Sequence, residues 1–162
     1  MSSPAGWSLP TIITLDSFGG DWNRYFATIY ECFRRDFVYG RPIYKGQRIG
    51  LKSHPVIEGK EATFWHLISD GDREAERLPD LRRCERICWP RYIIENLNDP
   101  AVKVWENTRN GKKRTLLWVE EAEYLVVIAE RTGYALIWTA YTVTRDNQKA
   151  KLRREYEAFI NP

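Results

Sequence analysis

Two short stretches of the sequence carry side chains that suit chemistry at a phosphate ester. "TFWHLIS" contains His66, and histidine is the side chain whose ordinary pKa favours proton transfer near neutral pH. "DLRRCERICWP" contains Arg82, Arg83 and Arg86, which fall on one side of a predicted helix. Their planar guanidinium groups can bind phosphate oxygens in pairs, which lysine cannot do. A base and a set of anion-binding groups are therefore present.

A third stretch, "ALIWTAYTV", supplies two hydroxyl groups. Strand alternation predicts that Ile137, Thr139, Tyr141 and Val143 share one face. Thr and Tyr also favour strands for packing reasons alone. We therefore expect the two hydroxyl groups to matter only if His66 and the arginines lie on the same face.

Ordinary structural explanations of these residues stay open. If "EATFWHLI" is a strand, His66 shares a face with Phe64 and Ile68 and needs only a hydrogen-bond partner in the core. The arginines, beside Asp80 and Glu85, equally fit a solvated helix surface with ion pairs. A catalytic role for these residues therefore depends on whether the three stretches lie side by side in the folded protein.

The elements of the first half follow from local patterns. "DWNRYFATIYECFRRDF" has apolar residues at helical spacing behind Asp21, which predicts an N-capped helix that ends near residues 39–40. The glycines and prolines of residues 41–60 leave room only for short strands near 48–51 and 56–57. The apolar run "EATFWHLI" is predicted to be the next strand.

The second half predicts helices, a sheet and a last helix. Residues 80–97 are expected to form two short helices with a break at Trp89-Pro90. Asn110-Gly111 and Thr132-Gly133 are turn signals between strand-like runs, so four strands should form an antiparallel meander. These features predict the α+β class.

The complete expected architecture places an N-terminal helix and central short helices on the four-stranded antiparallel meander, with a C-terminal helix. In that last helix Leu152, Tyr156 and Phe159 form the apolar side. Residues 1–20 are expected to be an extended lead-in, and residues 21–162 a single domain.

Composition argues against several classes of protein. No apolar run approaches the roughly 20 residues of a membrane-spanning helix, and the first residues lack a secretory signal, so a cytoplasmic protein is expected. Three cysteines cannot all pair, and their spacing does not suit zinc. Neither a phosphate-binding loop nor a metal-binding carboxylate cluster is present, so no cofactor and no metal are expected. A net charge of +3 tilts the chain towards anionic partners.

Taken in order, "GKEATFWHLIS", "DLRRCERICWPRYIIEN" and "LIWTAYTV" followed by "AKLRREYEAF" resemble the phage and toxin-associated branch of the barnase, EndoU, colicin and RelE-like (BECR) nucleases. The resemblance covers about residues 48–159 and rests on order and local pattern. It implies a metal-independent endoribonuclease whose site lies on the exposed face of the sheet. It also implies RNA as substrate, with tRNA as one candidate, and an inhibitory immunity or antitoxin protein as a partner.

On this resemblance, the catalytic residues would be His66 as the base, Arg83 and Arg86 as charge stabilisers, and Thr139 and Tyr141 as groups that position the phosphate. Members of the group vary their catalytic sets.

Further contacts with phosphate or RNA are expected from Lys60, Arg82 and Arg91. Arg82 can take the place of Arg83, and His54 is another candidate. Two other functions stay open: a non-catalytic module that binds nucleic acid or protein on the same sheet, and a metabolic enzyme for a small phosphorylated compound. A deep closed pocket would favour the metabolic enzyme over an open basic groove.

Overall fold

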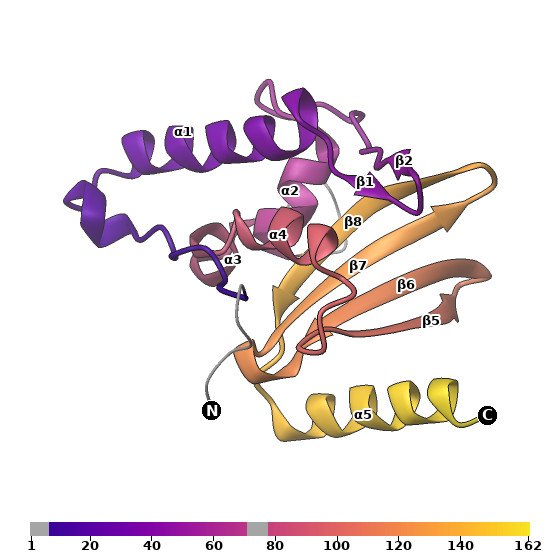
Figure 1. The fold of residues 1–162 in the computed structure, drawn as a ribbon. Coiled ribbons are helices and arrows are strands. Elements are labelled where there is room, and N and C mark those ends of the chain that lie inside the picture. Colours follow the sequence, from indigo (N-terminus) through magenta and orange to yellow (C-terminus); the bar gives the residue numbers. More distant parts are fainter. Residues whose placement is uncertain (1–6, 71–77) are drawn as a thin grey trace.

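The computed structural model describes residues 7–70 and 78–162 of the chain. It contains a four-stranded antiparallel sheet in the order β5-β6-β7-β8 (Figure 1). The strands are β5 (Lys103–Arg109), β6 (Lys112–Val119), β7 (Tyr124–Arg131) and β8 (Tyr134–Thr142). Each strand pairs with the next along the chain, which confirms the predicted α+β fold with its meander.

The two predicted turns join the strands that they were expected to join. Between β5 and β6, Asn110 and Gly111 have φ angles of 53° and 74°, the left-handed conformation that matches the twist of a two-residue hairpin. Thr132 and Gly133 connect β7 to β8, with a φ of 80° at Gly133. Between β6 and β7 the chain makes a short 3₁₀ turn, η4 (Glu120–Ala122).

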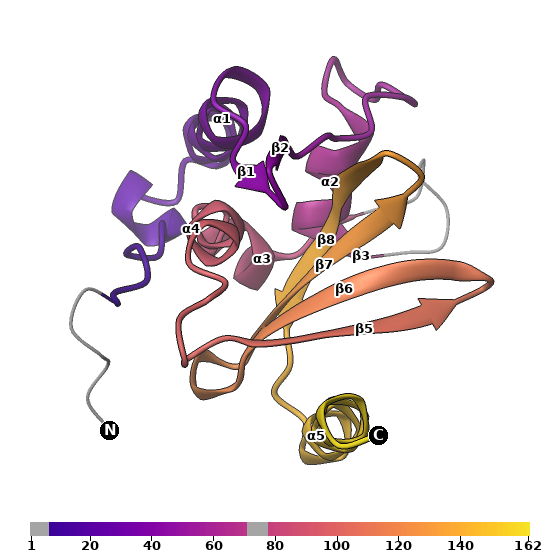
Figure 2. The same cartoon turned by 45° about the vertical axis from the view of Figure 1, so that its right-hand side comes forward.

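Helices cover one face of the sheet (Figures 1 and 2). They are α1 (Trp22–Phe33), its π-helical continuation η2 (Arg34–Tyr39), α2 (Ala62–Ile68), α3 (Leu81–Glu85) and α4 (Trp89–Glu95). The Asp21 side chain caps α1 by accepting from the backbone N–H of Arg24 at 3.2 Å, and the helical segment ends before Gly40, as predicted.

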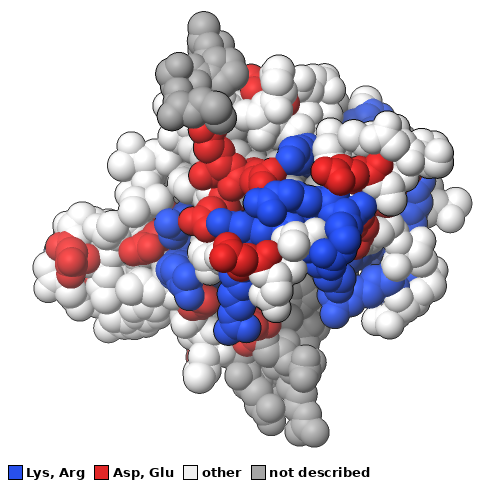
Figure 3. All heavy atoms as spheres, turned by 90° about the horizontal axis from the view of Figure 1, so that it is seen from below, with Lys and Arg blue, Asp and Glu red and all other residues white. Residues whose placement is uncertain are grey.

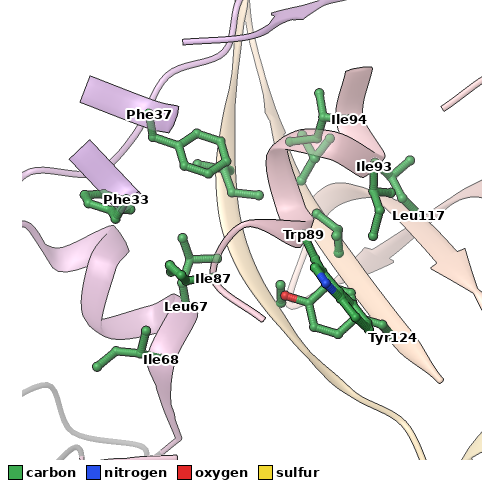
Figure 4. Packing of buried hydrophobic residues seen from close by; sticks show 14 of the residues in the cluster. Phe33, Phe37, Leu67, Ile68, Ile87, Trp89, Ile93, Ile94, Leu117 and Tyr124 are labelled. Atoms are coloured by element: carbon green, nitrogen blue, oxygen red, sulfur yellow. The ribbon is translucent and has the colours of Figure 1, made fainter. Parts of the chain in front are cut away.

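The main core lies between these helices and the sheet. Figure 4 shows side chains from both layers, such as Phe33, Ile93 and Leu117, in one cluster. Val126 and Ile128 of β7 belong to the same cluster. The sheet therefore turns one apolar face towards α1 to α4.

The segment "EATFWHLI" is the helix α2, so the predicted strand is wrong. All seven residues of α2 are buried, which means that no polar face is present to reveal the helical period. A short apolar run without a polar face fits a buried strand and a buried helix equally well. The correction changes the direction of every side chain in this segment.

The remaining small elements also differ from the prediction. The ribbons are β1 (Ile43–Tyr44) with β2 (Gln47–Arg48), and β3 (Ser69–Asp70) with β4 (Leu78–Pro79). Where strands were expected near 48–51 and 56–57, beyond β2 the chain makes only single bridges, from Gly50 to Leu136 and from Ile57 to Lys60. The helix break falls at residues 86–88, because Trp89 is the first residue of α4 and Pro90 lies in its first turn.

The lead-in before α1 is packed against the domain. It contains one 3₁₀ turn, η1 (Leu15–Phe18), and otherwise lacks regular structure over the described residues. The Trp7 side chain is buried, with its ring centroid 5.3 Å from that of Tyr92 in α4. Residues 1–6 of the predicted lead-in lie outside the described residues.

The predicted C-terminal helix, α5 (Asp146–Ile160), lies on the opposite face of the sheet (Figure 2). Its Leu152 and Tyr156 pack on a second apolar cluster, whereas Phe159, one turn further along, is 47% exposed. The buried members of that cluster are Trp105, Leu116, Trp118, Leu125, Val127 and Val143. The helix covers only part of this face.

A β-bulge in β8 breaks the expected alternation. The register shifts so that Val127 pairs with Thr139 while Ile128 pairs with Ile137. Ile137 therefore packs in the main core, although Tyr141 and Trp138 pack towards the second cluster. The prediction that Ile137 shares a face with the hydroxyl residues is wrong for this reason.

Among the described residues, no helix has the length and apolarity that crossing a membrane requires.

Candidate functional site: a basic groove on the open half of the sheet

Five of the predicted site residues line one cavity. We call this space, of about 580 Å³, the histidine cavity. It lies where α2, α3 and β8 meet, and the predicted residues in its wall are His66, Arg82, Arg83, Thr139 and Tyr141. The three stretches that the sequence left separate therefore converge.

His66 is positioned by α2, which packs against β8. The side chain is 4% exposed, and its ring centroid lies 5.1 Å from that of Trp138 at an interplanar angle of 59°. The His66 carbonyl oxygen accepts a hydrogen bond from the Thr139 hydroxyl at 2.7 Å. Thr139 thus ties α2 to β8 through the backbone of the histidine itself.

Arg83 reaches the same carbonyl from α3. Its Nη1 donates to the backbone oxygens of His66 at 3.2 Å and Ser69 at 2.8 Å, so it satisfies carbonyls at the C-terminal end of α2. The guanidinium carbon lies 5.3 Å from the centroid of the Tyr141 ring. Asp70 is 3.9 Å away but 87% exposed, which makes that ion pair a weak competitor for an anion. A largely buried cation is thereby fixed in the cavity wall.

Asp80 holds the start of α3 and the two arginines that follow. Its carboxylate accepts from the backbone N–H groups of Arg82 at 2.9 Å and Arg83 at 3.3 Å. As the N-cap of α3, the Asp80 carboxylate binds these backbone N–H groups and not the arginine side chains. The Arg82 side chain is exposed at the rim of the histidine cavity.

A second cavity adjoins the first. It measures about 460 Å³, and we call it the hairpin cavity because the β5-β6 hairpin forms much of its wall. Arg109 and Trp138 line both cavities, so the two spaces adjoin, and we call the two together the groove. The other cationic side chains of the hairpin cavity are Lys112, Arg114 and Arg131. Figure 3 shows Lys and Arg gathered in a band across the face that carries α5.

Arg114 is a groove residue that the sequence analysis missed. Burial lowers its pKa, and the charge of Tyr141 opposes that shift only in part. A signal for it was present: the Asn110-Gly111 turn fixes a register in which Arg114 lies opposite Asn107. Extending that register along the hairpin would have placed Arg114 on the face of Trp105 and Trp118.

Arg86 lies outside the groove. The helix α3 ends at Glu85, and Arg86 has the non-helical angles φ −106° and ψ 22°. The face predicted for three arginines is therefore broken after Arg83. The Arg86 guanidinium lies 5.1 Å from the Trp89 ring, and its Nη1 donates to Glu85 at 3.3 Å.

The other expected phosphate contacts also lie elsewhere. Lys60 Nζ is 5.1 Å from the Tyr30 ring, in a separate hollow beside α1. Arg91 donates to the backbone oxygen of Asp36 at 2.9 Å and pairs with Glu95 at 3.0 Å. Each has a local structural partner away from His66.

His54, the second histidine, is exposed and lines neither cavity of the groove. Within residues 7–70 and 78–162, no group of three or more His, Cys, Asp or Glu is placed to hold a metal ion. In comparisons with known proteins, no family model matches the chain, and neither a curated protein nor a solved structure matches it.

Proposed function

We propose that the protein is an endoribonuclease that cleaves RNA by attack of a ribose 2'-hydroxyl on the adjacent phosphate. One observation carries the proposal: His66, Arg83, Thr139 and Tyr141 surround a single cavity that opens into a groove lined by arginine and lysine. An open cationic groove suits a polyanion better than a small enclosed metabolite.

Each residue has a distinct role in the proposed reaction. The His66 imidazole takes the proton of the 2'-hydroxyl, and the resulting oxyanion attacks phosphorus. The bond from phosphorus to the 5'-oxygen breaks, a 2',3'-cyclic phosphate forms, and the leaving oxygen takes a proton from water. Arg83 and Arg82 stabilise the charge on the phosphorane-like transition state, and Tyr141 positions the phosphate. Arg82 replaces Arg86 because Arg86 points to Trp89.

The biological setting is part of the same proposal. It comprises RNA as substrate, tRNA as one candidate, a toxin-like or phage-associated role, a cytoplasmic location, and an inhibitory immunity or antitoxin protein as partner. The cytoplasmic location comes from the sequence composition, the other elements come from the sequence resemblance to the BECR nucleases, and all of them stay predictions.

Incubation of the purified protein with a panel of RNAs in the presence of a chelator tests the proposal. The panel includes structured tRNA, and the expected products carry 2',3'-cyclic phosphate ends. His66→Gln keeps a polar side chain in the core and should lower the cleavage rate by about 10²- to 10⁴-fold. Thermal melting shows whether this variant is folded.

His54→Gln is the matched control, because it removes the other, exposed histidine. Its cleavage rate should equal that of the wild type. If no RNA in the panel is cleaved by the wild-type protein, or if both histidine variants cleave alike, the endoribonuclease proposal is wrong.

A non-catalytic RNA-binding module is the second candidate. It is favoured by the contacts of Arg83 and Thr139 with backbone carbonyls of α2, which already account for both side chains as structural groups. This candidate predicts salt-dependent RNA binding without turnover, and binding that His66→Gln leaves unchanged.

A further inference from the structure

We infer that the hairpin cavity is a second phosphate-binding site, which holds the backbone of a single RNA strand at a phosphate other than the one that reacts. The inference rests on the proposed function, in which the reacting phosphate occupies the histidine cavity. Arg109 and Trp138 line both cavities, so a strand that leaves one cavity would enter the other past these two side chains.

The hairpin cavity has a cation that is fixed in place by the fold. Arg114 Nε donates to Asn107 Oδ1 at 3.0 Å. The Asn107 amide nitrogen in turn donates to Glu155 Oε1, which also accepts from the Trp105 indole at 2.8 Å. Glu155 belongs to α5 and therefore positions Arg114 through one intermediate side chain. A pre-oriented guanidinium loses little conformational freedom when it binds an anion.

The two terminal nitrogens of Arg114 are available to a ligand. In the part of the chain that the structure describes, neither has a hydrogen-bond partner, and no carboxylate forms an ion pair with this side chain. Burial lowers the pKa of Arg114, and the nearby Glu155 carboxylate opposes this only in part. A bound phosphate would add a counter-charge at the terminal nitrogens.

Cations near the hairpin cavity differ in whether they have a carboxylate partner. Lys113, which follows Lys112 on β6, pairs with Glu106 at 3.1 Å, and Arg153 of α5 bonds to Glu120. By contrast, Lys112 and Arg109 have no ion-pair partner among residues 7–70 and 78–162. In the described part of the chain, Lys112 and Arg109 thus lack a carboxylate partner, whereas Lys113 and Arg153 have one.

Trp138 favours a single strand over a duplex. Its partly exposed indole lies at the junction of the two cavities, within 5.9 Å of both the Lys52 ammonium and the Arg131 guanidinium. An aromatic ring between cationic sites is the arrangement on which unpaired bases stack while the backbone is neutralised. Paired bases would not be free to reach the ring.

Two adjacent lysines provide a matched test. Lys112 lines the hairpin cavity, whereas Lys113 does not, and both are exposed residues of the same strand. We would compare Lys112→Ala and Lys113→Ala for binding of a 2'-O-methyl RNA octamer, which cannot undergo 2'-hydroxyl attack. Fluorescence anisotropy at several salt concentrations gives the affinity and its salt dependence.

Lys112→Ala should weaken binding and reduce the slope of log K against log salt by about 0.7, the value for one lost contact with a single strand. Lys113→Ala should match the wild type. Arg114→Lys, which keeps the charge but loses the oriented fork, should also weaken binding. A DNA octamer distinguishes the source of the phosphates: equal slopes with RNA and DNA support recognition of the backbone.

Equal effects of the two lysine variants would overturn the second site, and duplex RNA binding as tight as the single strand would overturn the strand assignment. These results are separable from those on catalysis. RNA cleavage with indistinguishable lysine variants removes only the second site. Distinct lysine variants with no RNA cleaved remove only the endoribonuclease.

Discussion

The two faces of the sheet are made by the same strands, yet they differ in what covers them. On one face, Leu117, Val126 and Ile128 meet four helices and are buried. On the other, α5 covers the end of the sheet that holds Trp105 and Trp118, and leaves the end near the hairpin turn to cations. Alternate residues of one strand thus serve packing and binding separately. A change on one face should leave the property of the other nearly intact.

The largest predicted effect on stability comes from the face of the sheet that α1 to α4 cover. Ile128→Ala removes a fully buried side chain of β7 and should lower the free energy of unfolding by about 2 to 5 kcal/mol. RNA affinity of the folded protein should stay within twofold of the wild type, because Ile128 points away from the groove. Urea unfolding followed by circular dichroism measures the first quantity. A decrease in the free energy of unfolding below about 1 kcal/mol would contradict the close packing of this face.

A smaller effect is predicted at Glu155, where the covered and open halves of the second face meet. Glu155→Ala leaves the Trp105 indole and the Asn107 amide without their acceptor, which should cost about 1 to 3 kcal/mol of stability. It should also weaken RNA binding, because Arg114 loses its positioning.

The control is Glu157→Ala, which removes an exposed carboxylate two residues further along α5. It should change stability by less than about 0.5 kcal/mol. If Glu155→Ala and Glu157→Ala bind RNA equally well, α5 does not position the groove.

An inorganic anion should bind in the groove and stabilise the folded protein, without contacting the face of the sheet that α1 to α4 cover. Tripolyphosphate at ten times its dissociation constant should add about 1.4 kcal/mol to the free energy of unfolding, because it binds only the folded groove. Thermal melting with and without the anion measures this, and Arg114→Ala should show a smaller increase in Tm. An equal increase in both proteins would locate the anion elsewhere.

The smallest predicted effect is a local reactivity that leaves stability unchanged. A hydrogen bond from the Cys32 thiol, together with one from Arg35 at 3.5 Å, lowers the pKa of the Cys88 thiol to about 7. Since the thiolate is the reactive form, alkylation of Cys88 should be about tenfold faster at pH 8 than at pH 6. Mass spectrometry of iodoacetamide-treated protein checks this. Cys84, fully buried and with its pKa raised by burial, should stay unmodified in the folded protein.

Local patterns predicted the second half of the fold well. The Asn110-Gly111 turn, the alternation of β5 to β7 and the helical spacing of α5 each depend on neighbours in sequence. The N-cap at Asp21 is local for the same reason. Such features are encoded within a few residues, so sequence alone is sufficient to predict them.

Other features depend on contacts between distant segments and were missed. The helical form of α2 follows from burial on all sides, which erases its periodicity. The end of α3 at Glu85 separates Arg86 from Arg83, and no Gly or Pro marks that position. Five of the candidate site residues still lie together, because their convergence depends on the order of the elements more than on the conformation of α2.

The bulge in β8 has a consequence for how this sequence can change over evolutionary time. One additional residue near Trp138 sets the parity of the strand, so Tyr141 faces Arg83 and Ala140 faces the main core. Loss of the Trp138 codon would remove the bulge and restore simple alternation, because Val127 would still lie opposite Thr139 and Ile128 opposite Ile137. Tyr141 and Ala140 would keep their faces, and the groove would lose only the Trp138 indole. The strand β8 can therefore lose one residue at the bulge without exchanging the side chains of its two faces.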